Sequence, residues 1–174
     1  MKIILETERL LLREVDESDA DGFFEMDSDP EVARYVGNMP VESREKCVEI
    51  IRFVQSQYVD FGMGRWSVLL KETGEFLGWC GLKRMKDVDM NGKTDFVDLG
   101  YRFMRRHWGK GYATESARAS LQYGFEVMRL PGINAHADLR NTASVRVLTK
   151  IGLDRGEDFE YEGVRCAWFE KNSE

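Results

Sequence analysis

The apolar residues of the chain repeat with two different periods, which predict strands in some segments and helices in others. From 94 to 104 apolar and polar residues alternate, as in a strand with one buried face. After Ser43, a good N-cap residue, apolar residues instead recur at the i, i+3, i+4 and i+7 spacing of one helix face. This helix face, which we expect to lie in the core, consists of Cys47, Ile50, Ile51, Val54 and Tyr58.

The whole chain divides in this way into one series of elements, with no repeat or linker between them. We predict strands at 9–15, 65–71, 76–84, 94–104 and 133–137, a final hairpin at 159–171 turning near Gly163, and helices at 19–26, 30–35, 43–58, 111–128 and 141–150. This order favours a mixed α/β fold, with a mostly antiparallel central sheet flanked by helices. The strand–helix–strand unit from 94 to 137 should be a right-handed crossover between two parallel, adjacent strands.

Composition and charge narrow the class of protein. The 174 residues, of which 43% are hydrophobic and 32% charged, suit a single soluble domain over 1–174. A net charge of −6 argues against nucleic acid as the main ligand, and no apolar stretch is long enough to span a membrane. Three widely spaced cysteines, Cys47, Cys80 and Cys166, suggest neither a disulfide framework nor a metal site, so we expect a cytoplasmic location.

A glycine-rich turn, Arg106-His-Trp-Gly-Lys-Gly-Tyr-Ala-Thr-Glu115, joins the predicted strand at 94–104 to the predicted helix at 111–128. Glycine lets the backbone approach a ligand closely, and the first N–H groups of a helix have no partner within it. With the positive end of the helix dipole, these features favour a phosphate or diphosphate site. The turn is not a P-loop, and Thr114 stands where a dinucleotide fingerprint has its third glycine, which argues against an NAD-dependent oxidoreductase.

Residues 99–115, with Arg106, Gly109 and Gly111 in the pattern Arg-x-x-Gly-x-Gly, resemble the acetyl-CoA site of the GNAT N-acetyltransferase superfamily. Two further segments, Thr-Glu-Arg-Leu-Leu-Leu-Arg at 7–13 and the one at 141–153, resemble its RimJ/RimL branch. The resemblance implies a V-shaped split between the fourth and fifth strands that admits coenzyme A, and no metal. The coenzyme-binding residues that it implies are Phe103, Met104, Arg105, Arg106, His107, Trp108, Gly109, Lys110, Gly111, Tyr112, Ala113, Thr114, Asn141 and Ser144.

Acetyl transfer to an amine requires a group that removes a proton from the amine and favours an acid near the leaving thiolate. We favour Asp98, on the polar face of its strand, as the base, with Asp95 and Glu162 as weaker candidates. Asp98 is equally consistent with a solvated carboxylate or with a partner for Arg102. As the acid we favour Ser144, because some RimL-like enzymes use the serine of this segment.

Each of these interpretations has a structural alternative. Ser144 also suits the first turn of a helix capped by Asn141, and Leu148 stands where many relatives have a tyrosine acid. We expect Arg106 and Lys110 to form a solvated rim, while the backbone carries most of the diphosphate binding. Three further residues are expected to be structural, with Trp108 packed beneath the loop, His136 within its strand and Cys80 in the core. With Cys80 in the core, we favour direct transfer over a covalent acetyl-cysteine.

The resulting hypothesis is an acetyl-CoA-dependent N-acetyltransferase that works through a ternary complex. Its acceptor is a primary amine, which the sequence leaves open as a protein N-terminus, a lysine or a small amine. The acidic segment 154–162 either attracts a cationic acceptor or forms a solvated loop. A binding module that senses acyl-CoA without turnover is the alternative, and a homodimer is one possible assembly.

Overall fold

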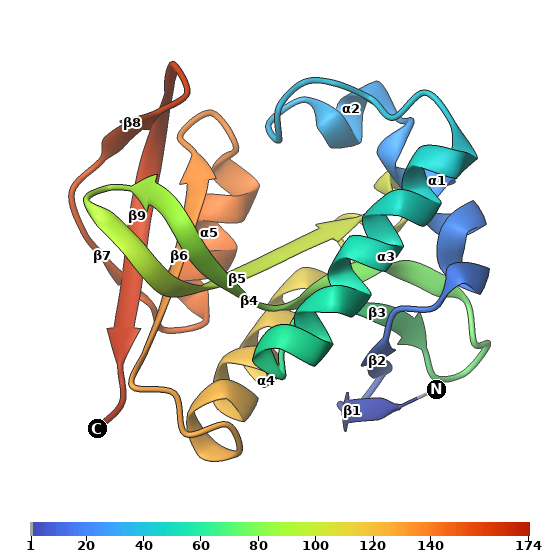
Figure 1. Cartoon of the computed structure of the whole chain (residues 1–174), viewed down its shortest axis with the longest axis horizontal. Coiled ribbons are helices and arrows are strands. Elements are labelled where there is room, and N and C mark those ends of the chain that lie inside the picture. The colour runs from blue at the N-terminus through green and yellow to red at the C-terminus, as the bar shows by residue number, and fades with distance from the viewer. Residues whose placement is uncertain (1) are drawn as a thin grey trace.

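The structure, a computed structural model, describes residues 2–174, which form one sheet of nine strands with helices on both faces (Figure 1). The strands pair in the order β1-β2-β3-β4-β5-β6-β9-β7, and β8 also pairs with β9. Their bounds are β1 Ile3–Glu6, β2 Leu10–Glu14, β3 Arg65–Leu70, β4 Phe76–Met90, β5 Lys93–Phe103, β6 Gly132–Asp138, β7 Asp154–Arg155, β8 Phe159–Tyr161 and β9 Val164–Asn172. All pairings except β5 with β6 are antiparallel, which confirms the predicted mixed α/β fold.

The helices begin and end close to the predicted positions. Their bounds are η1 Glu17–Asp19, α1 Ala20–Asp27, α2 Pro30–Ala33, α3 Arg44–Phe61, η2 Arg105–His107, α4 Tyr112–Glu126 and α5 Thr142–Lys150, where η1 and η2 are single 3-10 turns. Ser43 caps α3 by accepting a hydrogen bond from Lys46 N–H, and Gly62 ends this helix in the left-handed region at φ +67°. No helix in residues 2–174 is both long and apolar enough to cross a membrane.

Three strand features were not predicted. The chain forms β1 before the first predicted strand, β4 continues to Met90 rather than ending near 84, and the short strand β7 forms at Asp154–Arg155. In the extended part, β4 and β5 form a long hairpin whose tip packs Met90 and Phe96 against Phe159 and Trp168 of the last hairpin (Figure 1). These distant contacts stabilise a segment whose own sequence, rich in charged residues, carries only a weak strand signal.

The sheet splits between β5 and β6. These parallel strands share one register pair, Asp98 with Asn134, and then run apart toward their carboxyl ends (Figure 1). The connection from β5 to β6 runs through α4, which packs against the sheet, and Gly124 allows the helix to approach the sheet closely. A side chain there would meet Ile133 Cδ1 at 2.6 Å. Because β5 and β6 pair at only one register position and then diverge, the sheet has an opening between them.

The core has a separate apolar cluster on each face of the sheet. On the α4 and α5 face, Leu82, Leu99 and Leu121 are buried together with Leu148. On the α1 and α3 face, the buried residues include the predicted helix stripe at Cys47, Ile51 and Val54. The two clusters hold both arms of the split in place, and all three cysteines are buried and free.

An ion pair buried beside β2 yields a test of stability. Arg13 donates to both carboxylate oxygens of Asp19 at 2.8 and 2.6 Å, and Ser67 donates to the same carboxylate at 2.7 Å. Asp19→Asn is expected to lower the free energy of unfolding by about 3–5 kcal/mol, because it leaves a buried guanidinium without its counter-charge. The matched control Asp21→Asn, which removes the exposed partner of Arg44, should cost less than about 1 kcal/mol. Urea denaturation of both variants measures the difference, and equal losses would contradict the assignment.

Candidate active site

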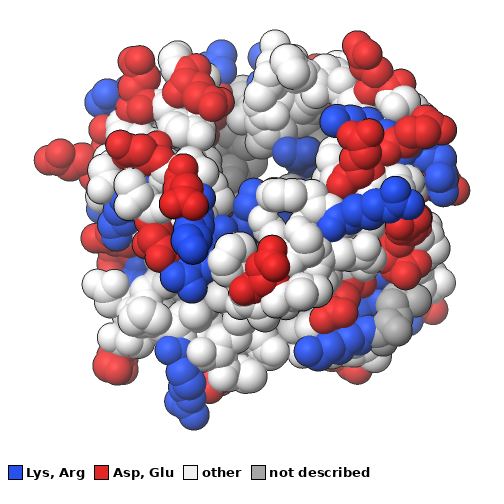
Figure 2. Space-filling view, in the orientation of Figure 1, with Lys and Arg blue, Asp and Glu red and all other residues white. Residues whose placement is uncertain are grey.

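Two adjoining cavities open where β5 and β6 diverge, and Figure 2 shows the hollow between the two arms with basic side chains at its floor. The split cavity, of about 600 Å³, lies between Asp98 to Tyr101 on β5 and His136 to Asp138 on β6. The loop cavity, of about 510 Å³, lies against the glycine-rich turn and the start of α4. The residues that line both are Tyr35, Val36, Tyr101, Arg140, Asn141 and Ser144.

The glycine-rich turn has the backbone of an anion site. Gly109 and Gly111 adopt φ +74° and +82°, which side chains disfavour, and Gly111 is the N-cap of α4. No side chain caps this helix, so its first N–H groups remain available to a ligand. The residues present therefore fit a diphosphate bound by main-chain amides and the helix dipole.

The segment between β1 and β2 holds this turn in place through side-chain hydrogen bonds. Arg9 donates through Nε to Glu115 at 2.7 Å and through Nη1 to the Lys110 carbonyl at 2.9 Å, while Thr7 donates to Glu115 at 2.6 Å. Burial disfavours the charged form of Glu115, but these hydrogen bonds outweigh it and hold the pKa of this carboxyl below its usual range. The Thr-Glu-Arg segment therefore sets the position of the turn, which no local pattern could indicate.

The loop cavity is lined by ten of the fourteen residues that the resemblance implies. They are Phe103, His107, Trp108, Gly109, Gly111, Tyr112, Ala113, Thr114, Asn141 and Ser144. The other four lie around it. Met104 is buried in the α1 and α3 cluster, Arg105 pairs with Asp29 at 3.0 Å, and Lys110 offers its carbonyl to Arg9. Arg106 pairs with Glu25 and Glu75 and its side chain is 46% exposed, which is consistent with a solvated rim residue.

Trp108 and His107 of the turn differ in burial, and Trp108 is not packed beneath the loop as expected. Trp108 is 48% exposed and donates its indole N–H to the Phe103 carbonyl at 2.9 Å, so it lines the cavity rather than packing beneath the loop. His107 is the buried ring, because the 3-10 turn η2 directs it inward to within 3.1 Å of a Glu75 oxygen. Burial lowers the pKa of His107, against the opposing effect of Glu75.

Asp98 lies at the base of the split cavity and is buried. Arg65 donates to Asp98 Oδ2 at 2.5 Å and to the carbonyls of Gly81 and Asp98 at 2.7 and 2.9 Å. The guanidinium crosses β5 at Gly100, where a Cβ would stand 2.7 Å from Arg65 Nη2. Burial works against the charged carboxylate, but Arg65 and His136 outweigh it and keep the pKa of Asp98 below its ordinary value. Asp98 is thus neither solvated nor paired with Arg102, which pairs instead with Asp27.

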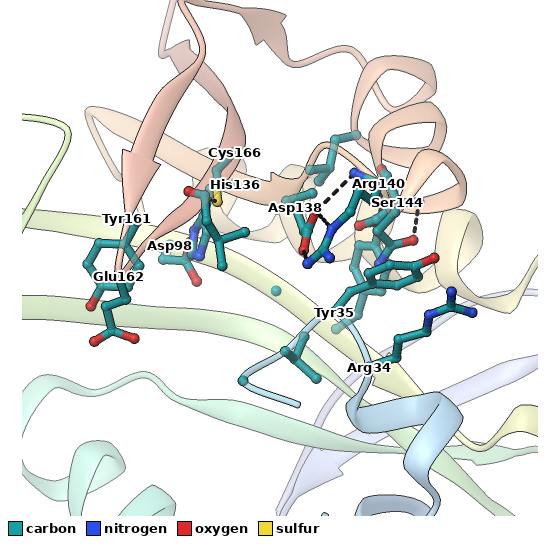
Figure 3. Close-up of a pocket in the computed structure, with 18 of the residues that line it drawn as sticks. Arg34, Tyr35, Asp98, His136, Asp138, Arg140, Ser144, Tyr161, Glu162 and Cys166 are labelled. Atoms are coloured by element: carbon teal, nitrogen blue, oxygen red, sulfur yellow. Dashed lines mark hydrogen bonds and ion pairs between the residues drawn. The ribbon is translucent and has the colours of Figure 1, made fainter. Parts of the chain in front are cut away.

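His136 faces Asp98 across the split. Its Nδ1 lies 3.3 Å from Asp98 Oδ1, and its ring lines the split cavity with 28% of the side chain exposed (Figure 3). The rings of Phe159 and Tyr161 flank it at 6.4 Å between centroids. We expected a structural histidine, because a lone histidine in such a strand is more often structural than catalytic. The carboxylate that faces it comes from β5, while Asp138, its neighbour in sequence, pairs with Arg140.

A pair of hydroxyl groups lies where the two cavities meet. Tyr101 Oη is 2.8 Å from Ser144 Oγ, and Asn141 caps α5 by accepting a hydrogen bond from Ser144 N–H at 3.2 Å. Burial raises the pKa of Tyr101, which keeps this phenol protonated. Leu148 is buried, so no hydroxyl stands at that position. The alternation from 94 to 104 puts Tyr101 on the apolar face of β5, and it did not identify this tyrosine as a site residue.

The remaining candidates divide between the cavity and other places. Glu162, in the β8–β9 turn at φ +49°, lines the split cavity. Asp95 is exposed on the β4–β5 hairpin and pairs with Arg84 at 2.8 Å, so it lies outside both cavities. Cys80 is fully buried with its thiol 3.5 Å from Ser120, and burial raises its pKa, which fits the expected core position.

Comparisons with known proteins agree with this geometry. A family model described as an acetyltransferase (GNAT) domain matches residues 9–154. The N-acetyltransferase p20 of Bacillus licheniformis, itself uncharacterised, is 34% identical over 151 residues, or 87% of this chain and 82% of that protein. A GNAT-family acetyltransferase structure from Bacillus anthracis has a TM-score of 0.80 at 26% identity, covering 99% of this chain and 98% of the other. RimL, a ribosomal L7/L12 alpha-N-protein acetyltransferase solved with coenzyme A, shares the fold with a TM-score of 0.80 at 14% identity, covering 99% and 98%.

Proposed function

The chain belongs to the GNAT family of acetyltransferases, and from this premise we propose that it transfers the acetyl group of acetyl-CoA directly to a primary amine in a ternary complex. One observation carries the proposal. The loop cavity has a backbone suited to a diphosphate, and it meets the split cavity, which holds a buried carboxylate and a histidine, at six shared residues. The donor and the acceptor would therefore occupy adjoining cavities and meet at the shared residues, as direct transfer requires.

The residues of the loop cavity would hold acetyl-CoA. Main-chain N–H groups from His107 to Tyr112 would bind the diphosphate, and the pantetheine arm would run past Phe103 toward Tyr101 and Ser144. Asn141 keeps its side-chain NH₂ group for this arm, because only its oxygen is used in the helix cap. When bound, the thioester supplies an electrophilic carbonyl carbon.

Transfer then requires the acceptor nitrogen to lose two protons and the leaving thiolate to gain one. An acceptor ammonium loses one proton at the wall of the split cavity that holds Asp98, and the free amine forms the C–N bond. The C–S bond breaks, and the departing thiolate takes a proton from the Ser144 hydroxyl. Tyr101 replenishes that hydroxyl through the 2.8 Å contact and regains its own proton from solvent. The amide nitrogen releases its second proton to solvent, so the sum is amide, thiol and one proton.

The acceptor is proposed to be a primary amine on a protein N-terminus, a lysine or a small molecule. RimL acetylates a protein N-terminus, and an acceptor of this class would suit the split cavity. Glu162, which lines that cavity, favours a cationic group. Mass spectrometry of an amine and peptide panel incubated with acetyl-CoA should show the gain of one acetyl group on at least one member. Coenzyme A binding without acetylation or thiol release across the panel would support the acyl-CoA sensor, and NAD binding in place of coenzyme A would support an oxidoreductase.

The hydrogen bonds from Arg9 to the turn predict a specific change in coenzyme affinity. Arg9→Ala should raise the dissociation constant of coenzyme A about tenfold, since it removes charge-assisted hydrogen bonds worth roughly 1.5–3 kcal/mol that hold Lys110 and Glu115. Isothermal calorimetry measures this constant. Arg44→Ala, which removes an exposed arginine that pairs with Asp21, serves as the matched control and should leave this constant unchanged.

A further inference from the structure

We propose that His136 is the group that accepts the proton of the attacking amine, and that Asp98 acts through it as a positioning residue. The inference rests on the proposed function and names its proton acceptor. The two residues come from different strands, β5 and β6, next to the one register pair that joins them, Asp98 with Asn134. They therefore meet at the point where the split begins, with the imidazole facing the cavity (Figure 3).

The contact fixes which imidazole nitrogen is free. Asp98 Oδ1 and His136 Nδ1 lie 3.3 Å apart, and both atoms are shielded from solvent. Among residues 2–174 neither atom has a hydrogen-bond partner, and the 3.3 Å ion-pair contact is what joins them. A carboxylate only accepts hydrogen bonds, so the stable neutral tautomer carries its proton on Nδ1. Nε2 then keeps a lone pair with which it can take a proton from an amine in the split cavity.

Asp98 is poorly suited to accept that proton itself. Its Oδ2 is held by Arg65, which is in turn fixed by two backbone carbonyls and by stacking at 5.2 Å on the Trp79 ring. An ion-paired, buried carboxylate binds a proton weakly, whereas general bases work best when their affinity for protons matches the operating pH. Arg65 therefore fixes the carboxylate so that Oδ1 faces the histidine, and the imidazole performs the transfer.

The groups around the imidazole do not block proton transfer from an amine to His136. Besides Asp98 on β5, the ionisable groups facing His136 are Tyr161 on β8 and Cys166 on β9, with Asp138 and Glu162 on the same cavity wall. Asp138 is neutralised by Arg140 at 2.6 Å. The proton moves from the acceptor ammonium to Nε2, the amine electron pair forms the C–N bond, and His136 later releases the proton to solvent through the open cavity.

The tautomer can be measured without any acceptor. The chain has two histidines, so long-range ¹H–¹⁵N spectra of uniformly labelled protein contain two imidazoles, and a His107→Gln variant identifies the other. We expect the neutral form of His136 to carry its proton on Nδ1, and we expect this preference to be lost in Asp98→Ala. A proton on Nε2 in the wild type would overturn the proposal.

Kinetics provide a second test of the proposal. Thiol release from acetyl-CoA is measured with spermidine, glucosamine, an alanine tripeptide and a lysine peptide as acceptors. His136→Gln should lower kcat/KM for the best of these amines by about 10²–10⁴-fold and leave coenzyme A affinity within about twofold. Because Asp98 acts through His136, the double variant with Asp98→Asn should be no slower than the slower single variant. Activity of His136→Gln within about threefold of wild type, or losses that multiply, would refute the proposal. If the wild type acetylates none of the four amines, the proposed function is put in doubt and the tautomer still decides this inference.

Discussion

Asparagine in place of Asp98 is expected to lower kcat/KM for amine acetylation by about 10²–10³-fold, because it removes the charge that orients the proton acceptor. The dissociation constant of coenzyme A should stay within about twofold of wild type, since Asp98 lines the split cavity and not the loop cavity. The change therefore separates chemistry from donor binding. Thiol-release kinetics with the best panel amine, and calorimetry with coenzyme A, measure the two quantities.

The same substitution also affects stability, and the control takes this into account. Asp98→Asn leaves the buried guanidinium of Arg65 without its counter-charge, which should cost about 3–5 kcal/mol of unfolding free energy. Rates are therefore compared at a temperature at which circular dichroism shows the variant folded. Asp95→Asn changes an exposed carboxylate on the same strand and should keep full activity. Wild-type activity in Asp98→Asn would exclude a role for this carboxylate in the reaction.

Valine in place of Gly109 is expected to weaken coenzyme A binding by at least about 30-fold, which corresponds to about 2 kcal/mol. Gly109 has φ +74°, and a Cβ there would meet no protein atom within 4 Å. The open space beside it is where the diphosphate is proposed to bind, so an added side chain would keep the ligand from the backbone amides. Calorimetric titration with coenzyme A gives the affinity directly.

Gly74 offers a control with the same backbone strain. It also has φ +74° and open space around it, but it lies in the β3–β4 turn and outside both cavities. Gly74→Val and Gly109→Val should therefore lose similar stability, of the order of 1–3 kcal/mol, while only Gly109→Val loses coenzyme affinity. Equal affinities in the two variants would place the diphosphate elsewhere.

Much of the fold was predictable because its signals are local. Alternation from 94 to 104 correctly predicted β5, although the face that it marks as polar carries the buried Asp98. The capped stripe after Ser43 correctly predicted α3. The glycine pair and the helix that follows predicted a turn with left-handed glycines and an uncapped helix start. In each case the information lies within about four residues, which is the range over which period and capping act.

The sequence by itself determined the elements, their order, the family and the turn at Gly109 to Gly111, because each depends on residues that are neighbours in the chain. Only the tertiary structure decided the partners of the functional side chains. Arg65, Asp98 and His136 meet because β3, β4, β5 and β6 lie side by side in one register, and Tyr101 meets Ser144 because α5 returns to β5. A one-residue shift of any of these strands would turn its side chains to the opposite face, so local patterns cannot specify such contacts.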